Sequence, residues 1–249
     1  MRGRRAIRTA ISNNPAMPSK FFPAPGLATP EGLVAVGGDL TTSRLLDAYR
    51  HGIFPWPTSA GEPLLWWSPD PRAVFPIGVM RVSRRLARRI RSATFQMTCD
   101  VAFPAVIEAC GTEPGRRFAT WLTPDMIAAY VELHRQGYAH SVEAWQGDRL
   151  VGGVYGVAVG GLFAAESMFY RVRDASKVAL YFLTHHLEQR GYRLFDIQQW
   201  TPHTGSLGAI EMPRIQYLRR LSRAVDLPVT FGDRLETPSP QATNGRNTP

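Results

Sequence analysis

Apolar residues recur at the three- and four-residue spacing of an α-helix in six stretches of the chain. In one stretch Val82, Leu86 and Ile90 lie four residues apart and form a narrow seam. Capping residues and glycines mark the ends of several stretches, such as Thr123 before one helix and Gly191 after another. The pattern predicts helices over residues 42–51, 83–91, 103–110, 124–136, 174–190 and 214–221.

Between the fourth and fifth of these helices the pattern changes to that of β-strands. Residues 141–145 and 149–158 are predicted to form a hairpin that turns at Gln146-Gly147-Asp148, and residues 162–169 continue the meander. A further strand is predicted over residues 192–198. A meander followed by a helix and one more strand is typical of the α+β class.

The ends of the chain differ from its middle. Residues 1–20 and 236–249 are polar and lack periodicity, so both are predicted to be flexible tails. Residues 21–75 are dense in Pro, Gly and Trp and are predicted to form a small N-terminal α/β domain that leans on the rest. Residues 76–235 carry most helices and strands and form the larger domain.

Composition narrows the class of protein. The 249 residues are 44% hydrophobic, which suits a packed core, and 29 basic against 20 acidic residues give a net charge of +9. This charge favours an anionic partner, most simply nucleic acid or a membrane surface. No signal peptide is recognised, and the longest charge-free apolar stretch, residues 150–165, is shorter than the roughly 20 residues of a spanning helix. With two cysteines and no disulfide scaffold, the sequence indicates a cytoplasmic protein.

Arginines gather in and just before the second predicted helix, with no acidic residue between positions 71 and 99. Like charges repel one another without local acids, so this face is interpreted as a site for a phosphate backbone. The alternative is a solvated face in an arginine-biased sequence, since every basic residue except Lys20 and Lys177 is an arginine. The arginines concerned are Arg81, Arg84, Arg85, Arg88, Arg89 and Arg91.

Tryptophans next to prolines suggest a second contact with nucleic acid. Trp56, Trp66 and Trp67 lie in the Pro-rich segment, and Trp121 precedes the fourth predicted helix. Exposed tryptophans stack on nucleobases, whereas buried ones would only pack the small domain. The sequence leaves both interpretations open.

Three polar side chains end apolar strands and are candidates for a cleft. Glu166 follows an apolar, glycine-rich run, and Asp196 and Gln198 lie two residues apart, so both point to one face of their strand. The alternative is a set of buried, hydrogen-bonded polar groups without chemistry. The histidines are scattered and GxSxG, CxxC and nucleotide-binding motifs are missing, so the residues do not support a metal site.

Several long, uncommon sequence motifs follow one another between about residue 21 and residue 222. They are GLVAVGGDL (32–40), RLLDAYRHGIFPW (44–56), LWWSPDPRAV (65–74), TWLT (120–123), AHSVEAW (139–145), LVGGVYGV (150–157), ESMF (166–169), ASKVAL (175–180) and SLGAIEMPR (206–214). In these motifs the chain resembles the bacterial leucyl/phenylalanyl-tRNA–protein transferases. Ile197 departs from that family's usual cysteine between Asp196 and Gln198, which are both present.

The resemblance implies an acetyltransferase-like (GNAT) fold for the larger domain, and it implies a reaction. Leu or Phe would pass from its aminoacyl-tRNA to the α-amine of a protein whose N-terminal residue is Arg or Lys, which marks that protein for degradation. The tRNA ester is already activated, so no cofactor is implied. The implied partners are Leu-tRNA, Phe-tRNA and the acceptor protein, with no membrane, and a monomer is expected.

The resemblance also implies roles for single residues. Asp196 would hold the amide of Gln198 so that this pair orients the attacking amine, and Glu166 together with Asp196 would bind the acceptor's cationic end. The terminal adenine would stack on Trp56 and Trp121. The tRNA stem would lie along Arg81, Arg84, Arg85, Arg88 and Arg89. The aminoacyl side chain would enter a pocket of Val154, Phe163, Met168, Leu183 and Phe195.

Two other functions stay open. An acyl-CoA-dependent N-acyltransferase would share the GNAT fold, but residues 171–176 (RVRDAS) lack the glycines of that group's pyrophosphate-binding loop. A non-catalytic tRNA-binding protein is the second alternative, which the presence of Glu166, Asp196 and Gln198 disfavours.

Overall fold

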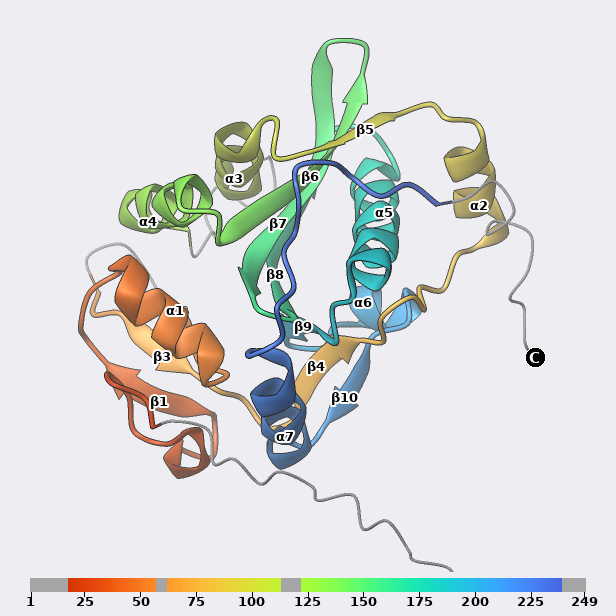
Figure 1. Ribbon diagram of the computed structural model, residues 1–249. Coiled ribbons are helices and arrows are strands. Elements are labelled where there is room, and N and C mark those ends of the chain that lie inside the picture. The colour runs from red at the N-terminus through yellow and green to blue at the C-terminus, as the bar shows by residue number, and fades with distance from the viewer. Residues whose placement is uncertain (1–17, 57–61, 113–121, 239–249) are drawn as a thin grey trace, which may run out of the picture.

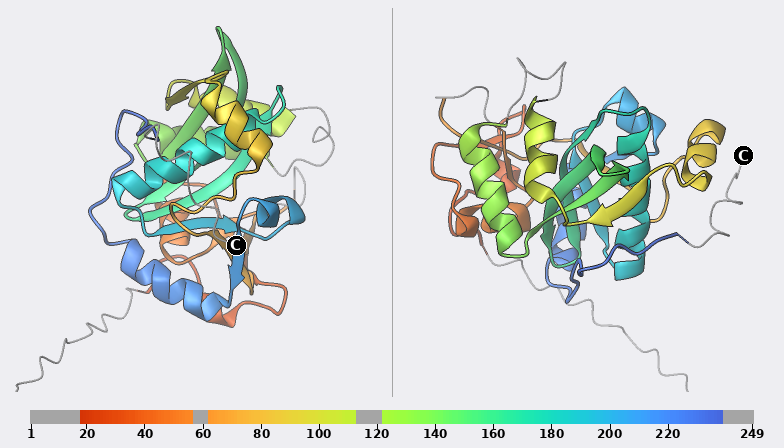
Figure 2. Two further views of the ribbon diagram at one scale, coloured as in Figure 1. Left: turned by 90° about the vertical axis from the view of Figure 1, so that its right-hand side faces the viewer. Right: turned by 90° about the horizontal axis from the view of Figure 1, so that it is seen from above.

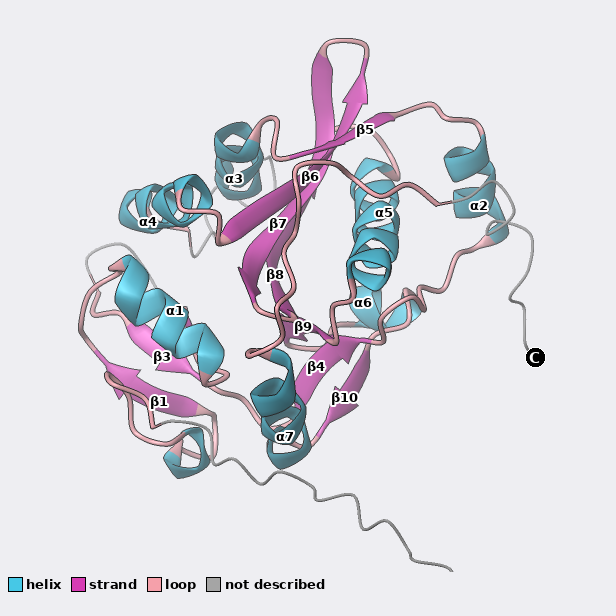
Figure 3. Ribbon diagram, viewed as in Figure 1, coloured by secondary structure: helices cyan, strands magenta, loops and turns pink. Residues whose placement is uncertain are grey.

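The computed structural model describes residues 18–56, 62–112 and 122–238 (Figure 1). Most of both predicted tails and the predicted stacking residue Trp121 therefore lie outside the described residues. Two sheets with helices around them make the protein α+β, as the sequence predicts (Figure 3). Within the described residues, no helix combines the length and the apolar character needed to cross a bilayer.

The larger sheet has the strand order β10-β4-β9-β8-β7-β6-β5. All neighbouring strands are antiparallel except β8 and β9, which are parallel. The hairpin and meander predicted from the sequence are confirmed as β6, β7 and β8. The strands are β4 (Arg72–Phe75), β5 (Gln96–Cys99), β6 (Ala139–Gln146), β7 (Arg149–Val159), β8 (Leu162–Tyr170), β9 (Leu194–Gln198) and β10 (Ile210–Met212).

The parallel pair β8 and β9 separates after only three residue pairs, the last of which joins Ala164 to Asp196. Beyond this point β8 continues to Tyr170 in pairing with β7, and a register shift makes Glu166 the extra residue of a bulge. Glu166 and Gln198 therefore lie where the two strands diverge.

The predicted helices are confirmed to within one or two residues at their ends, except that α7 continues three residues beyond its predicted end. One short helix, α6, is an addition that the sequence pattern did not indicate. The helices are α1 (Thr42–Arg50), α2 (Arg84–Arg91), α3 (Phe103–Thr112), α4 (Pro124–Arg135), α5 (Ala175–Arg190), α6 (Pro202–Ser206) and α7 (Arg214–Ala224).

Helices cover both faces of the larger sheet (Figures 1 and 2). Side chains of α1, α3, α4 and α7 share one buried cluster with Tyr155 of β7 and Ala164 of β8. Side chains of α5 share a second cluster with Val154, Phe163 and Phe195, which alternate with the first set along the same strands. The helix α2 packs beside α5 through Leu86.

The N-terminal segment contains a short antiparallel sheet of order β1-β3-β2, formed by Leu33–Val36, Leu65–Trp67 and Phe54–Pro55. Trp66 is fully buried there, and its indole N–H donates to the carbonyl of Gly37 at 2.8 Å. This tryptophan packs the core. The following strand β4 already pairs with β9 in the larger sheet.

Candidate active site

A buried ion pair lies at the end of β9. The guanidinium of Arg72 donates from Nε and Nη2 to the two carboxylate oxygens of Asp196 at 2.9 and 2.6 Å, and both side chains are 1% exposed. Its Nη1 donates to the carbonyl of Gly52 at 3.1 Å. The rings of Phe54 and Tyr217 lie 4.8 and 4.6 Å from the guanidinium carbon. The two hydrogen bonds to Asp196, the one to Gly52 and two aromatic faces thus compensate the guanidinium for the loss of water.

Asp196 accepts two further hydrogen bonds. The hydroxyl of Tyr217 donates to Oδ2 at 2.7 Å, and the main-chain N–H of Gln198 donates to Oδ1 at 2.9 Å. A cation of the same chain therefore already contacts both oxygens of Asp196, an arrangement that favours Glu166 over Asp196 for the predicted binding of the acceptor's cationic end. Asp196 instead holds the backbone at Gln198, whose φ of 60° is left-handed.

The amide of Gln198 is held by a different carboxyl group from the one expected. Its Nε2 donates to Oε1 of Glu166 at 3.0 Å, which leaves Oε1 of Gln198 as the accepting end of the amide. Asp196 acts on the main chain of Gln198 and not on its amide, so the expected direct contact is corrected. Glu166, Asp196 and Gln198 nevertheless lie together where β8 and β9 diverge.

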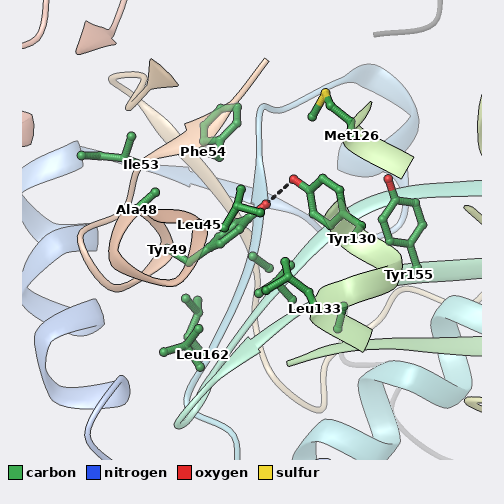
Figure 4. Packing of buried hydrophobic residues seen from close by; sticks show 14 of the residues in the cluster. Leu45, Ala48, Tyr49, Ile53, Phe54, Met126, Tyr130, Leu133, Tyr155 and Leu162 are labelled. Atoms are coloured by element: carbon green, nitrogen blue, oxygen red, sulfur yellow. Dashed lines mark hydrogen bonds between the residues drawn. The ribbon is translucent and has the colours of Figure 1, made fainter. Parts of the chain in front are cut away.

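Two tyrosines support Glu166 from the helices that cover this face. The hydroxyl of Tyr130 in α4 donates to Glu166 Oε2 at 3.2 Å, and it lies 2.6 Å from the hydroxyl of Tyr49 in α1 (Figure 4). Burial raises the pKa of both phenols well above their ordinary value, so they stay neutral. Sequence patterns did not single out either tyrosine, since the two are 81 residues apart.

The carboxyl of Glu166 titrates far from its ordinary range. Burial is the main cause that raises its pKa to about 8, and the charge of Asp196 adds to this. Hydrogen bonds from the tyrosines and the charge of Arg72 oppose the rise and are smaller. The side chain keeps some contact with solvent. Near neutral pH, Glu166 therefore holds a proton that an incoming cation can displace.

The five predicted pocket residues do lie together, on the α5 face of the sheet. Val154, Phe163, Leu183 and Phe195 belong to one cluster and are fully buried, and Met168 packs against them with partial exposure. Glu166 and Asp196 reach the opposite face, so the two sets meet only where β8 and β9 diverge.

A cavity of about 700 Å³ lies elsewhere, at the other end of these strands. It is lined among others by Gly160, Tyr192 and Phe231, and none of its lining residues belongs to the predicted site. The geometry of the polar groups, and not this cavity, therefore defines the candidate site.

The arginines of α2, and Arg81 in the segment before it, are mostly exposed. Arg81, Arg84, Arg85 and Arg88 are exposed, and Arg89 is partly buried with its guanidinium 5.7 Å from the centre of the Phe95 ring. No acidic residue lies near these arginines in the sequence, but Asp174, which directly precedes α5, accepts a hydrogen bond from Arg85 at 3.0 Å. One arginine of this face thus has an acidic partner that is distant in the sequence.

The remaining tryptophan of the predicted adenine site is half-buried at the end of β2. The ring of Trp56 lies 6.2 Å from that of Phe54, which in turn covers the Arg72 guanidinium. Trp56 is thereby linked to the ion pair. Within the described part of the chain, no group of three or more His, Cys, Asp or Glu side chains is placed to hold a metal ion.

Comparisons with known proteins agree on one family. The model of the leucyl/phenylalanyl-tRNA–protein transferase family matches residues 74–222, and the model of its N-terminal domain matches residues 38–70. A leucyl/phenylalanyl-tRNA–protein transferase of Nitratidesulfovibrio vulgaris (strain DP4) is 52% identical over 85% of this chain and 91% of its own length. Proteins of the same name from Thiobacillus denitrificans and Chromohalobacter salexigens are 51% and 54% identical, over 84% of this chain and over 92% and 82% of their own lengths. This chain therefore belongs to the leucyl/phenylalanyl-tRNA–protein transferase family.

Proposed function

We propose that this protein transfers Leu or Phe from aminoacyl-tRNA to the α-amine of a protein that begins with Arg or Lys. Membership of the family supports the aminoacyl-tRNA donor and the protein acceptor. The observation that carries the proposal for this chain is the amide of Gln198, fixed by Glu166 on its side chain and by Asp196 on its backbone. In the cell, such a transfer would mark the acceptor protein for degradation.

We propose a GNAT-like fold for the larger domain, residues 76–235, with residues 21–75 as a small N-terminal domain. The parallel pair β8 and β9, which opens after three residue pairs beside a long helix, supports this assignment. The two parts share one buried cluster, since Tyr49 of α1 packs with Tyr130 of α4.

The reaction joins the α-amine of the acceptor to the carbonyl carbon of the tRNA ester. The carbon–nitrogen bond forms, the bond to the ribose oxygen breaks, and the proton lost by the amine passes to that oxygen, through a neighbouring ribose hydroxyl. A peptide α-amine has a pKa of about 7.7–8.0, so an appreciable fraction of it is already neutral near pH 7 and no strong base is needed. Gln198 Oε1 would accept a hydrogen bond from the amine and orient its lone pair.

Glu166 would bind the cationic side chain of the acceptor's first residue. It is the one carboxyl of the three-residue site whose oxygens are not paired with Arg72, and its partners are neutral donors from Gln198 and Tyr130. A guanidinium or ammonium beside it would displace the proton and form a charge-assisted hydrogen bond.

The aminoacyl-tRNA donor would contact several parts of the protein around Gln198. Its terminal adenine would stack on Trp56 and Trp121, and its acceptor stem would lie along the arginines of α2 and Arg81. Its Leu or Phe side chain would pass between β8 and β9 toward the cluster around Met168, whose flexible side chain suits both shapes.

The affinity for an Arg-peptide is expected to rise with pH because only ionised Glu166 pairs with a cation. A carboxyl with a pKa of about 8 is mostly protonated at pH 6.5 and mostly ionised at pH 9, so the KM for the peptide should fall about 30-fold over this range. In Glu166→Gln, the KM for the peptide should be high at every pH, and the pH dependence caused by Glu166 should be absent. The pH dependence caused by ionisation of the α-amine should remain. Peptide transfer measured from pH 6.5 to 9 checks this.

The matched control is Glu132→Gln, which changes a partly exposed glutamate on α4 and should keep the wild-type profile. If Glu166→Gln kept both the KM and its full pH dependence, Glu166 would not be the residue that binds the acceptor's cation.

A further inference from the structure

Trp200 is a large aromatic side chain that the reaction described above leaves without a role. It lies two residues beyond Gln198 on the connection between β9 and β10, and it is 43% exposed. Its ring packs on Gly205 of α6 so closely that a Cβ atom there would lie 2.3 Å from the ring carbon Cζ2. Thr201 and Thr204 form a capping box that fixes α6. The ring is therefore held in place with much of its surface in solvent.

Basic residues lie beside the connection that carries Trp200. Lys177 at the start of α5 lies near His203 of α6, where burial and then the charge of Lys177 lower the pKa of His203. On the other side of the connection, the N–H of Arg81 donates to the carbonyl of Leu207 at 2.8 Å. An exposed aromatic ring on a connection with basic residues beside it suits a nucleobase better than the cationic N-terminus of an acceptor.

The connection between β9 and β10 also links the two parts of the protein that the aminoacyl-tRNA would contact, Gln198 and the segment that leads into α2. It begins at Gln198, where the ester carbonyl has to lie, and at Leu207 it touches the segment of Arg81 that leads into α2 (Figure 1). A strand of RNA that ran along this connection, from Arg81 to Gln198, would pass Trp200.

We propose that Trp200 is a nucleotide-binding residue, on which a base of the single-stranded 3′ end of tRNA stacks, next to the terminal adenosine. The inference rests on the proposed function and adds a third stacking position to it. Stacking uses the π-face that every base presents, so the position would tolerate any base.

The test compares Trp200→Ala with the wild type on three donors: Leu-tRNA, the trinucleotide CCA carrying Leu, and adenosine carrying Leu. The KM for Leu-tRNA and for Leu-CCA should rise about tenfold, a typical loss for one stacked base. The KM for Leu-adenosine, the KM for the Arg-peptide and kcat should stay unchanged, since these do not involve the stacked base. Trp200→Phe should restore most of the affinity.

Tyr138→Ala is the matched control, because Tyr138 is 39% exposed and precedes β6 at the other end of the sheet. The proposal is overturned if Trp200→Ala leaves the KM for Leu-CCA unchanged, if it changes Leu-adenosine equally, or if it raises the KM of the peptide instead. Failure of the proposed function is a separate result, since the wild type would then transfer Leu from none of the donors.

Discussion

Replacing Arg72 with methionine should lower the free energy of unfolding by about 3–5 kcal/mol, the usual cost of leaving a buried charge without its partner. Asp196 is 1% exposed and takes two of its hydrogen bonds from this guanidinium. Methionine fills most of the space between the rings of Phe54 and Tyr217 but offers no donor and no charge. The buried carboxylate then keeps its hydrogen bonds from Tyr217 and the N–H of Gln198 but loses its cationic partner. Urea unfolding followed by circular dichroism gives the value.

Arg50→Met is the matched control for Arg72→Met. Arg50 pairs with Asp226 at the surface, where the two side chains are 40% and 69% exposed, so its loss should cost at most about 1 kcal/mol. Equal losses in the two variants would show that the Arg72–Asp196 pair does not hold the end of β9.

Replacing Gln198 with alanine should reduce kcat about 100-fold with little change in the KM for Leu-tRNA, because it removes the group that orients the amine and leaves donor binding intact. Gln198→Asn keeps an amide one methylene shorter and should lose less. Asparagine also tolerates the left-handed φ of 60° at this position. Steady-state transfer to an Arg-peptide measures both constants.

Gln199→Ala, one position further along, removes the same chemical group from an exposed side chain and should keep wild-type turnover. Thermal unfolding of each variant separates loss of function from loss of fold. A kcat for Gln198→Ala within threefold of the wild type would contradict the role assigned to the amide.

The helices could be predicted from the sequence because their signals are local. The helix α4 begins after Thr123, whose hydroxyl accepts from the N–H of Met126, and α5 ends just before Gly191, which adopts a φ of 85°. The strands β1 to β4 contain two to four residues each, too few for a two-residue period to show. The strand β4 also pairs with β9, more than 100 residues away, so only the folded sheet defines that partner.

The residues of the site also differ in whether a local sequence signal indicates them. Glu166, Asp196 and Gln198 could be predicted because a polar residue at the end of an apolar strand stands out. Arg72 could not, since it meets Asp196 across 124 residues of sequence and an arginine after Asp-Pro is typical of an exposed turn. Without this partner, Asp196 was expected to bind the substrate, whereas the structure uses it to hold Gln198.

The most direct test of the account is transfer of radiolabelled Leu from Leu-tRNA to three peptides that differ only in a first residue of Arg, Lys or Ala. Label is expected on the Arg and Lys peptides and not on the Ala peptide, since only the first two offer a cation to Glu166. Equal labelling of all three would contradict the role of Glu166. No label on any peptide, while the protein still binds tRNA, would contradict the transfer reaction itself.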